Sequence, residues 1–299
     1  MTRIYLFIPV FLLLLSACQT SQPIDPAYLQ ELSDWRAERM AELKAPDGWL
    51  ALAGLYWLEK GENTFGSGPE NKIQFPVVAP AKIGTLTLEG DSVRMTILPG
   101  TSVREKGQTE VLERAVLKLL PDTPPTMYTW GSLQWVLIER GGKYGIRLWD
   151  TNSVRIHSLD SIPQFPVNPR WRVEATLRPA DANRSVTMQN VLGMTITQAS
   201  AGTLAFTWEG KEYQLEALQD PEGYFLIFSD DTSGKETYGG GRYLYAPTAD
   251  ANGKTIIDFN KAYNPPCAFT KFATCLLPPA ENSLPFAIRA GELSYGDHD

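Results

Sequence analysis

Two cysteines and two proline pairs lie close together near the C-terminal end of the chain. Cys267 and Cys275 have seven residues between them, with one Pro-Pro pair directly before the first cysteine and another shortly after the second. Proline holds its own backbone extended and pushes the preceding residue out of helical space. Residues 258–291, which we call the strap, are therefore expected to form a rigid, irregular segment laid across a folded body.

The two thiols of the strap allow three kinds of chemistry. In an oxidising compartment two nearby cysteines are most simply a disulfide, which would stabilise the fold by roughly 2.5 kcal/mol in the chain-entropy model. They can also be reduced structural thiols. A nucleophilic or redox thiol would need a neighbouring cation, and Lys261 and Lys271 are close in sequence. We predict a Cys267–Cys275 disulfide and keep the other two possibilities open.

Carboxylates are the other candidate catalytic groups. Asp230 lies in a turn after a predicted strand, Asp258 ends another strand, and Glu292 follows a third. Two carboxylates across a cleft can hydrolyse a glycosidic bond. The same pattern is typical of turns, in which Asp and Thr oxygens bind local backbone N–H groups. The candidate ligand-binding residues of this region are Asp230, Thr232, Tyr238, Arg242, Asp258, Asn260, Tyr263, Asn264, Asn282 and Glu292.

Histidine is scarce, and its scarcity excludes several classes of enzyme. His298 is next to the C-terminal residue, and His157 alternates with apolar neighbours, as an ordinary strand residue would. One dependable imidazole cannot build a His-rich metal site, and no G-x-S-x-G sequence supports a Ser-His-Asp triad. The three glycines at 239–241 precede a predicted strand rather than a helix, so they form no phosphate-binding loop. We expect neither a metal nor a cofactor.

The N-terminal residues predict export and a lipid anchor. Arg3 precedes an apolar run at 4–15, which is too short for a membrane-spanning helix, and Leu-Ser-Ala-Cys follows at 15–18. This pattern resembles a bacterial lipobox, which implies a signal peptide at 1–17, lipidation of Cys18 and a tether at 18–24. Gln19 after the cysteine favours the outer membrane, facing the periplasm. The predicted membrane partner is therefore the bilayer that holds the acyl chains.

The charge balance bounds the remaining partners. The chain has 27 basic and 34 acidic residues, for a net charge of −7. A protein this acidic offers no phosphate-seeking surface, so we expect no nucleic-acid partner.

Short strands with tight turns dominate the chain after one N-terminal helix. Asp25 and Pro26 predict the start of the helix, and Pro46 and Gly48 mark its end. The apolar block that follows, at 49–68, ends in glycines and fits a buried strand or a buried helix. Three hairpins are predicted, at 85–98, 133–149 and 203–218, with further strands at 224–228, 242–245, 254–259 and 286–290.

These elements predict a mainly β protein, an antiparallel sandwich or barrel-like sheets preceded by one N-terminal amphipathic helix. The proline-rich residues 161–170 are the best place to divide it into 25–160, the helix plus a β part, and 161–299, a β part with the strap. They can equally be a crossover within one continuous domain.

The C-terminal sequence blocks resemble a known family. FSDDTSGKETYGGGRYLY at 228–245 and DFNKAYNPPCAFTKFATCLLPP at 258–279 are similar to the bacterial and archaeal domain of unknown function 1684, and the similarity extends over residues 30–293. The resemblance implies a mostly β fold, frequent export and a group of polar residues near the strap. It implies no assigned reaction.

Two classes of function remain open on this sequence. We predict a lipid-anchored envelope protein that binds a small ligand, a glycan or a protein partner through a polar pocket near the strap. The alternative is an envelope hydrolase that uses Asp230, Asp258 and Glu292, or a cysteine thiol. An interaction scaffold without a pocket is the third possibility.

Overall fold

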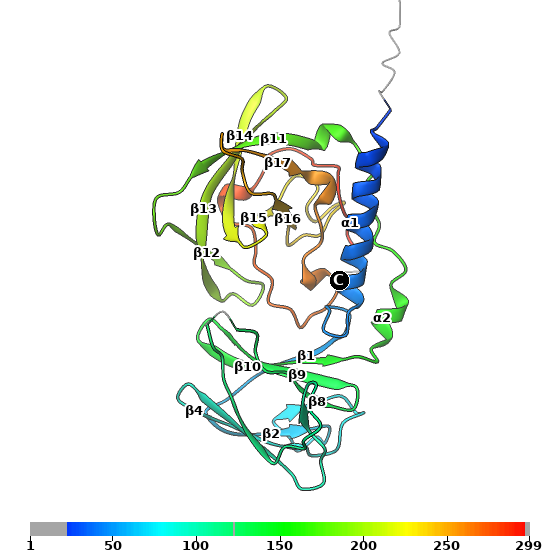
Figure 1. The fold of residues 1–299 in the computed structure, drawn as a ribbon, viewed down its shortest axis with the longest axis vertical. Helices are drawn as coiled ribbons and strands as arrows, with labels where there is room; N and C mark the ends of the chain where they lie inside the picture. Colours follow the sequence, from blue (N-terminus) through cyan, green and yellow to red (C-terminus); the bar gives the residue numbers. More distant parts are fainter. Residues whose placement is uncertain (1–22, 122, 297–299) are drawn as a thin grey trace, which may run out of the picture.

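The computed structural model describes residues 23–121 and 123–296, and it confirms a mainly β protein built from antiparallel sheets. Figure 1 shows two bodies, one below the other. The lower body is built from two five-stranded sheets and the upper body from one seven-stranded sheet. The predicted signal peptide at 1–17, Cys18, most of the tether at 18–24 and His298 lie outside the described residues.

Helix α1 (Pro26–Lys44) begins and ends where the sequence predicts. The Asp25 carboxylate accepts a hydrogen bond from the Ala27 amide at 2.9 Å, and proline suits the first helical position because its missing N–H has no partner there. No helix within the described ranges is long and apolar enough to cross a membrane. The buried stripe of α1, at helical spacing, consists of Leu32, Arg39 and Leu43.

The lower body consists of two sheets that enclose one apolar core. Their strand orders are β1-β10-β9-β8-β6 and β3-β2-β4-β5-β7, and β3 runs parallel to β2 while the other pairs are antiparallel. The core between them includes Phe65, Leu86, Trp135 and Ile146. The strands are β1 (Leu52–Trp57), β2 (Gly61–Gly66), β3 (Ile73–Gln74), β4 (Gly84–Glu89), β5 (Ser92–Ile97), β6 (Arg104–Glu105), β7 (Arg114–Leu117), β8 (Tyr128–Trp130), β9 (Leu133–Arg140) and β10 (Lys143–Asp150).

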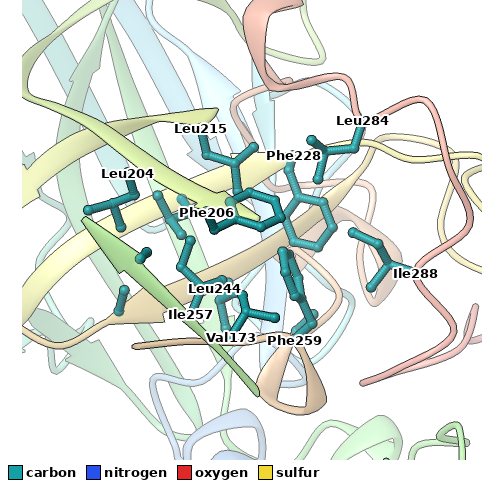
Figure 2. Packing of buried hydrophobic residues seen from close by; sticks show 14 of the residues in the cluster. Val173, Leu204, Phe206, Leu215, Phe228, Leu244, Ile257, Phe259, Leu284 and Ile288 are labelled. Atoms are coloured by element: carbon teal, nitrogen blue, oxygen red, sulfur yellow. The ribbon is translucent and has the colours of Figure 1, made fainter. Parts of the chain in front are cut away.

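The upper body is one sheet in the order β16-β15-β14-β13-β11-β17, with β12 paired to β13. Its edge strands β16 and β17 contact each other, so the sheet curls around its own core. Figure 2 shows this core, where the rings of Phe206 and Phe228 both pack edge-on against Phe259. The strands are β11 (Arg172–Pro179), β12 (Ser185–Gln189), β13 (Thr195–Trp208), β14 (Lys211–Asp220), β15 (Gly223–Phe228), β16 (Arg242–Ala246) and β17 (Lys254–Asp258).

The three predicted hairpins are confirmed as β4–β5, β9–β10 and β13–β14. In the β9–β10 turn, Gly141 and Gly142 have φ angles of 58° and 75°, which glycine adopts without strain and which match the twist of a two-residue hairpin. The apolar block at 49–68, left open between helix and strand, contains the strands β1 and β2.

Two local predictions are wrong. His157 lies exposed in a short helix, α2 (Val154–Ser158), because apolar alternation over so few residues does not distinguish a strand from a helical turn. Residues 286–290 form no strand, so Glu292 does not follow one. Instead, the buried Arg242 side chain donates to the carbonyls of Ile288 and Ala290 and replaces the missing ladder bonds.

Short 3-10 turns complete the strap and its surroundings. Between two of these turns the strap pairs with the sheet, since the carbonyl and amide of Tyr263 exchange hydrogen bonds with Tyr243 of β16 at 2.9 Å. These turns are η1 (Pro169–Trp171), η2 (Phe259–Lys261), η3 (Pro266–Ala268) and η4 (Ala280–Asn282).

Helix α1 precedes the lower body in sequence but packs along the upper body (Figure 1). Two of its side chains contact the far end of the chain, since Lys261 Nζ lies 2.6 Å from Glu31 and the Tyr28 hydroxyl donates to Asp258 at 2.8 Å. The division of the chain at 161–170 stays a prediction. Helix α1 precedes this division in sequence, yet it contacts residues that follow it.

Candidate functional site

The ten predicted polar residues are mostly interior. Tyr238 and Tyr263 are half-buried, and the other eight are buried. A buried polar group needs a hydrogen-bond partner, so the partners of each residue decide whether it can serve a ligand. The partners assign nine of these residues, all but Tyr238, to four networks.

The first network joins Asp230 to Arg242. Their side chains form an ion pair with no exposed surface on either partner. Thr232 donates both its amide and its hydroxyl to the other carboxylate oxygen of Asp230. Burial lowers the pKa of Arg242, and the adjacent Asp230 opposes that shift. This pair fixes residues 288–290 of the strap against β16.

The second network fastens the start of α1. Both oxygens of Asp258 accept from the Tyr28 hydroxyl, at 2.8 and 2.9 Å, and Asn260 donates to the same hydroxyl at 3.0 Å. Asn260 also exchanges hydrogen bonds with the backbone of Asn168 at 3.0 Å. Burial and Asp258 raise the pKa of Tyr28. Asp258 therefore anchors a helix in this structure.

The third network fastens the end of α1. One oxygen of Glu292 accepts from the Asn264 amide at 2.7 Å, and the other lies 3.4 Å from Arg39 Nε. Arg39 also donates to the Asn264 carbonyl at 2.8 Å and lies 4.5 Å from the Tyr263 ring centre. Burial raises the pKa of Glu292, and Arg39 partly offsets the shift.

The fourth network replaces sheet hydrogen bonds with a side chain. Asn282 accepts from the Glu216 amide at 2.6 Å and donates to the carbonyls of Glu216 and Ile227 at 3.0 and 2.8 Å. Burial raises the pKa of Tyr238, the remaining candidate, to about 12. The three candidate carboxylates thus belong to different networks, and each already accepts hydrogen bonds from the protein.

The predicted disulfide is wrong, because Cys267 and Cys275 are both free thiols. The turn η3 directs the Cys267 amide at the second sulfur, and this amide donates to Cys275 Sγ at 3.0 Å. The two thiols also hydrogen-bond to each other, which lowers the pKa of Cys267. Burial raises the pKa of Cys275.

A cleft of about 520 Å³ lies between the two bodies, beside the strap. This volume is in the range of small-molecule sites. The lower body contributes residues 139–141, from the end of β9 and its turn, with Trp49 and Arg147. None of the ten polar candidates lines it. The upper body and the strap contribute Ile196, Gln198, Phe225, Tyr243, Pro266, Thr274, Cys275 and Leu276.

Arg147 is the unusual charge of this cleft. It lies on β10 between Leu55 and Val136, on the face of the sheet turned away from the core of the lower body. Its Nε is buried without a hydrogen-bond partner, and no carboxylate within the described ranges pairs with it. The guanidinium lies 5.3 Å from the Trp49 ring centre. Burial and the neighbouring Arg140 lower the pKa of Arg147 to about 10.

Three other interior arginines are paired, whereas Arg36, which lies outside the cleft, shares with Arg147 a buried Nε that has no hydrogen-bond partner. Arg242 and Arg39 have carboxylate partners, and Arg155 donates to the carbonyls of Leu52 and Phe269. An unpaired cation that has lost part of its water destabilises the fold, and a second cation nearby adds repulsion. Charged groups whose pKa values are strongly shifted by their surroundings are concentrated at functional sites. Chemically, Arg147 and Arg140 can bind an anion.

A signal for this site lies outside the sequence motifs, in the strand next to Arg147. Residues 133–138 of β9 are buried at every position, which indicates a sheet covered on both faces. The second cover is an apolar cluster that includes Leu52, Val136, Ile138 and, from the strap, Phe272. A charged residue on the neighbouring strand must then be half-buried, and Arg147 occupies that position in GIRLW.

Comparison with known proteins places the C-terminal part in an uncharacterised family. Residues 157–293 match the family described as Protein of unknown function (DUF1684). The family resemblance of the residues before 157 stays a prediction. These earlier residues include Arg147 and the rest of the lower-body side of the cleft. No protein among the curated ones compared matches the chain significantly.

Among solved structures, the chain is similar to the solution NMR structure of an uncharacterized protein from gene locus rrnAC0354 of Haloarcula marismortui. The sequences are 30% identical over 46% of this chain and 78% of that one, with a TM-score of 0.39.

Proposed function

We propose that this protein binds a small organic anion in the cleft between its two bodies. The observation that carries the proposal is the half-buried Arg147, which has no partner anion in the described structure and lies in a cleft large enough for a ligand. A bound carboxylate or phosphate would restore the charge balance of Arg147 and reduce its repulsion with Arg140. The ligand would thus be the counter-ion of Arg147, which no side chain in the described ranges provides.

The other walls define the rest of the ligand. Trp49 already packs against the guanidinium, and Phe225, Ile196 and Leu276 add apolar surface. Glu139 also lines the cleft, but within the described ranges its carboxylate forms no ion pair with Arg140 or Arg147, and one of its oxygens accepts from the amide of Gly142 in its own turn. A flat or apolar body that carries one anionic group fits these walls best.

Binding is favoured over carboxylate hydrolysis. Asp230, Asp258 and Glu292 each hold a different structural network, and none of them lines the cleft. Hydrolysis of a glycosidic bond by a carboxylate pair needs two carboxyl groups that face one substrate.

The proposal also includes the envelope location that the N-terminal sequence predicts. Lipid on Cys18 would anchor the protein to the outer membrane, facing the periplasm, with α1 starting a few residues later. In cells fed a palmitate analogue, we expect label on the wild-type protein and none on Cys18→Ser. Equal labelling of both proteins would contradict the anchor.

The anion proposal is tested with Arg147→Gln against a matched control. Arg170 also stacks on a tryptophan, 5.1 Å from the ring centre of Trp208, but it is exposed and does not line the cleft. A panel of aromatic and aliphatic carboxylates and phosphate monoesters is screened by thermal shift, and the best ligand is measured by calorimetry. We expect Arg147→Gln to weaken binding by about 10-fold to 100-fold, because one hydrogen bond to a charged group contributes about this factor to the affinity.

Arg170→Gln should bind the same ligand as tightly as wild type. Arg147→Gln should also keep the stability of the free protein, since it removes a charge that has no partner. The proposal is wrong if no anion of the panel binds, or if Arg147→Gln and wild type bind with equal affinity.

A further inference from the structure

The two thiols form a second group of chemical interest at the edge of the cleft. Cys275 lines the cleft, and the Cys267 amide donates to the Cys275 sulfur at 3.0 Å, so both cysteines belong to one packed cluster. Neither thiol is used by the anion site proposed above. Two adjacent, unbonded sulfur atoms are a pair of soft metal ligands.

The backbone holds both sulfur atoms in place without a covalent bond between them. The first cysteine lies in the turn η3, after a Pro-Pro pair. On the other side, the Val191 amide donates to the Cys275 carbonyl at 2.9 Å, and the Tyr243 hydroxyl donates to the Leu276 carbonyl at 2.9 Å. A ligand pair held this way loses little freedom when a metal binds.

The charge around the pair fits a metal thiolate. When one Cu(I) ion replaces the protons of two thiols, two protons are released and the complex carries a net charge of −1. Arg147 has no carboxylate partner in the described ranges, and it lines the same cleft as Cys275. It can therefore balance the complex, just as it can balance an organic anion. We propose that Cys267 and Cys275 bind one Cu(I) ion as a two-coordinate bis-thiolate complex.

The surroundings favour Cu(I) over zinc. Structural zinc requires four ligands, and the described ranges contain no cluster of three or more His, Cys, Asp or Glu side chains that could hold a metal. The hydroxyls near the pair, from Tyr238 and Tyr243, are hard oxygen groups. Thiolates select the soft monovalent ion, which two ligands can satisfy.

The test uses the full chain with Cys18→Ser, so that Cys267 and Cys275 are the remaining thiols. Cu(I) is titrated without oxygen against a coloured chelator. We expect one Cu(I) per chain, with an apparent affinity that falls more than about 100-fold in Cys267→Ser and in Cys275→Ser, because a direct ligand contributes at least as much as an outer partner. Zn(II) should not compete at equal concentration.

Arg147→Gln should weaken Cu(I) binding by about 10-fold, which corresponds to a modest coupling energy between Arg147 and the bound complex. Arg170→Gln should leave it unchanged. Equal Cu(I) binding by the parent and both serine variants would overturn the proposal and identify an adventitious metal only. Cu(I) that binds no more tightly than Zn(II) would overturn it as well.

A second measurement needs no cysteine variant, in case those chains fold poorly. In the parent chain, one equivalent of Cu(I) should protect both Cys267 and Cys275 from alkylation, and X-ray absorption should show two sulfur neighbours. Unprotected thiols, or oxygen and nitrogen neighbours, would contradict the site. Anion binding is measured separately without metal, so either proposal can fail while the other stands.

Discussion

Replacing Asp230 with alanine is expected to lower the free energy of unfolding by about 3–5 kcal/mol, the usual effect of removing one partner of a buried ion pair. The variant leaves Arg242, which is 1% exposed, without a carboxylate inside the upper body. It also removes the acceptor for the amide and hydroxyl of Thr232. The measurement is urea unfolding followed by tryptophan fluorescence.

Asp231→Ala is the matched control for this substitution. Asp231 is the next residue, but it is exposed and its side chain forms no ion pair within the described ranges. Its replacement should change the stability by less than about 0.5 kcal/mol. If Asp230→Ala and Asp231→Ala were equally stable, Asp230 would not be structural and would again be a candidate for binding a ligand.

Replacing Glu292 with alanine is expected to destabilise the protein by about 3 kcal/mol, because Arg39 loses its buried carboxylate and the Asn264 amide loses its acceptor. Since Arg39 is on α1, amide exchange in the second half of this helix should rise more than exchange in the lower body. Hydrogen exchange read by mass spectrometry, with urea unfolding in parallel, measures both effects.

Two comparison variants separate the buried network from charge alone. Glu292→Gln keeps the size and an acceptor oxygen, so it should lose less stability than Glu292→Ala. Glu236→Ala breaks the exposed pair with Arg289, in which the side chains are 38% and 62% exposed, and should cost less than about 1 kcal/mol. A loss as large in Glu236→Ala as in Glu292→Ala would contradict a structural role that depends on burial.

The local elements of this fold are readable from sequence because their signals are local. Asp25 caps α1 and Pro26 starts it, and glycines at 141 and 142 set a hairpin turn. These features depend on backbone geometry within a few residues. The strap lacks such signals: residues 286–290 have strand-like composition, yet the guanidinium of Arg242, on a distant strand, takes the role of a ladder partner.

The candidate site was harder to predict, because it depends on which residues the fold brings together. Asp258 and Glu292 have the residue type and position of ligand-binding groups, but α1 supplies Tyr28 and Arg39 as their partners from more than 200 residues away. Arg147 belongs to no motif. Its importance follows from the covering of both faces of its sheet, which is a tertiary property.

The cysteines illustrate the same limit in another way. Two thiols separated by a short loop are typical of a disulfide, but η3 turns the Cys267 amide toward the second sulfur instead. Sequence spacing sets how close two residues can come, whereas bond formation needs particular Cα distances and Cβ directions.

The most direct test of the central claim is a crystal structure of the protein grown with selenate, a tetrahedral oxyanion with an anomalous signal. We predict a selenate in the cleft, with an oxygen about 3 Å from a guanidinium nitrogen of Arg147. The account would be contradicted by a cleft that holds no selenate and an Arg147 that is paired with a carboxylate of the protein. The arginine would then lack the unpaired charge from which anion binding is inferred.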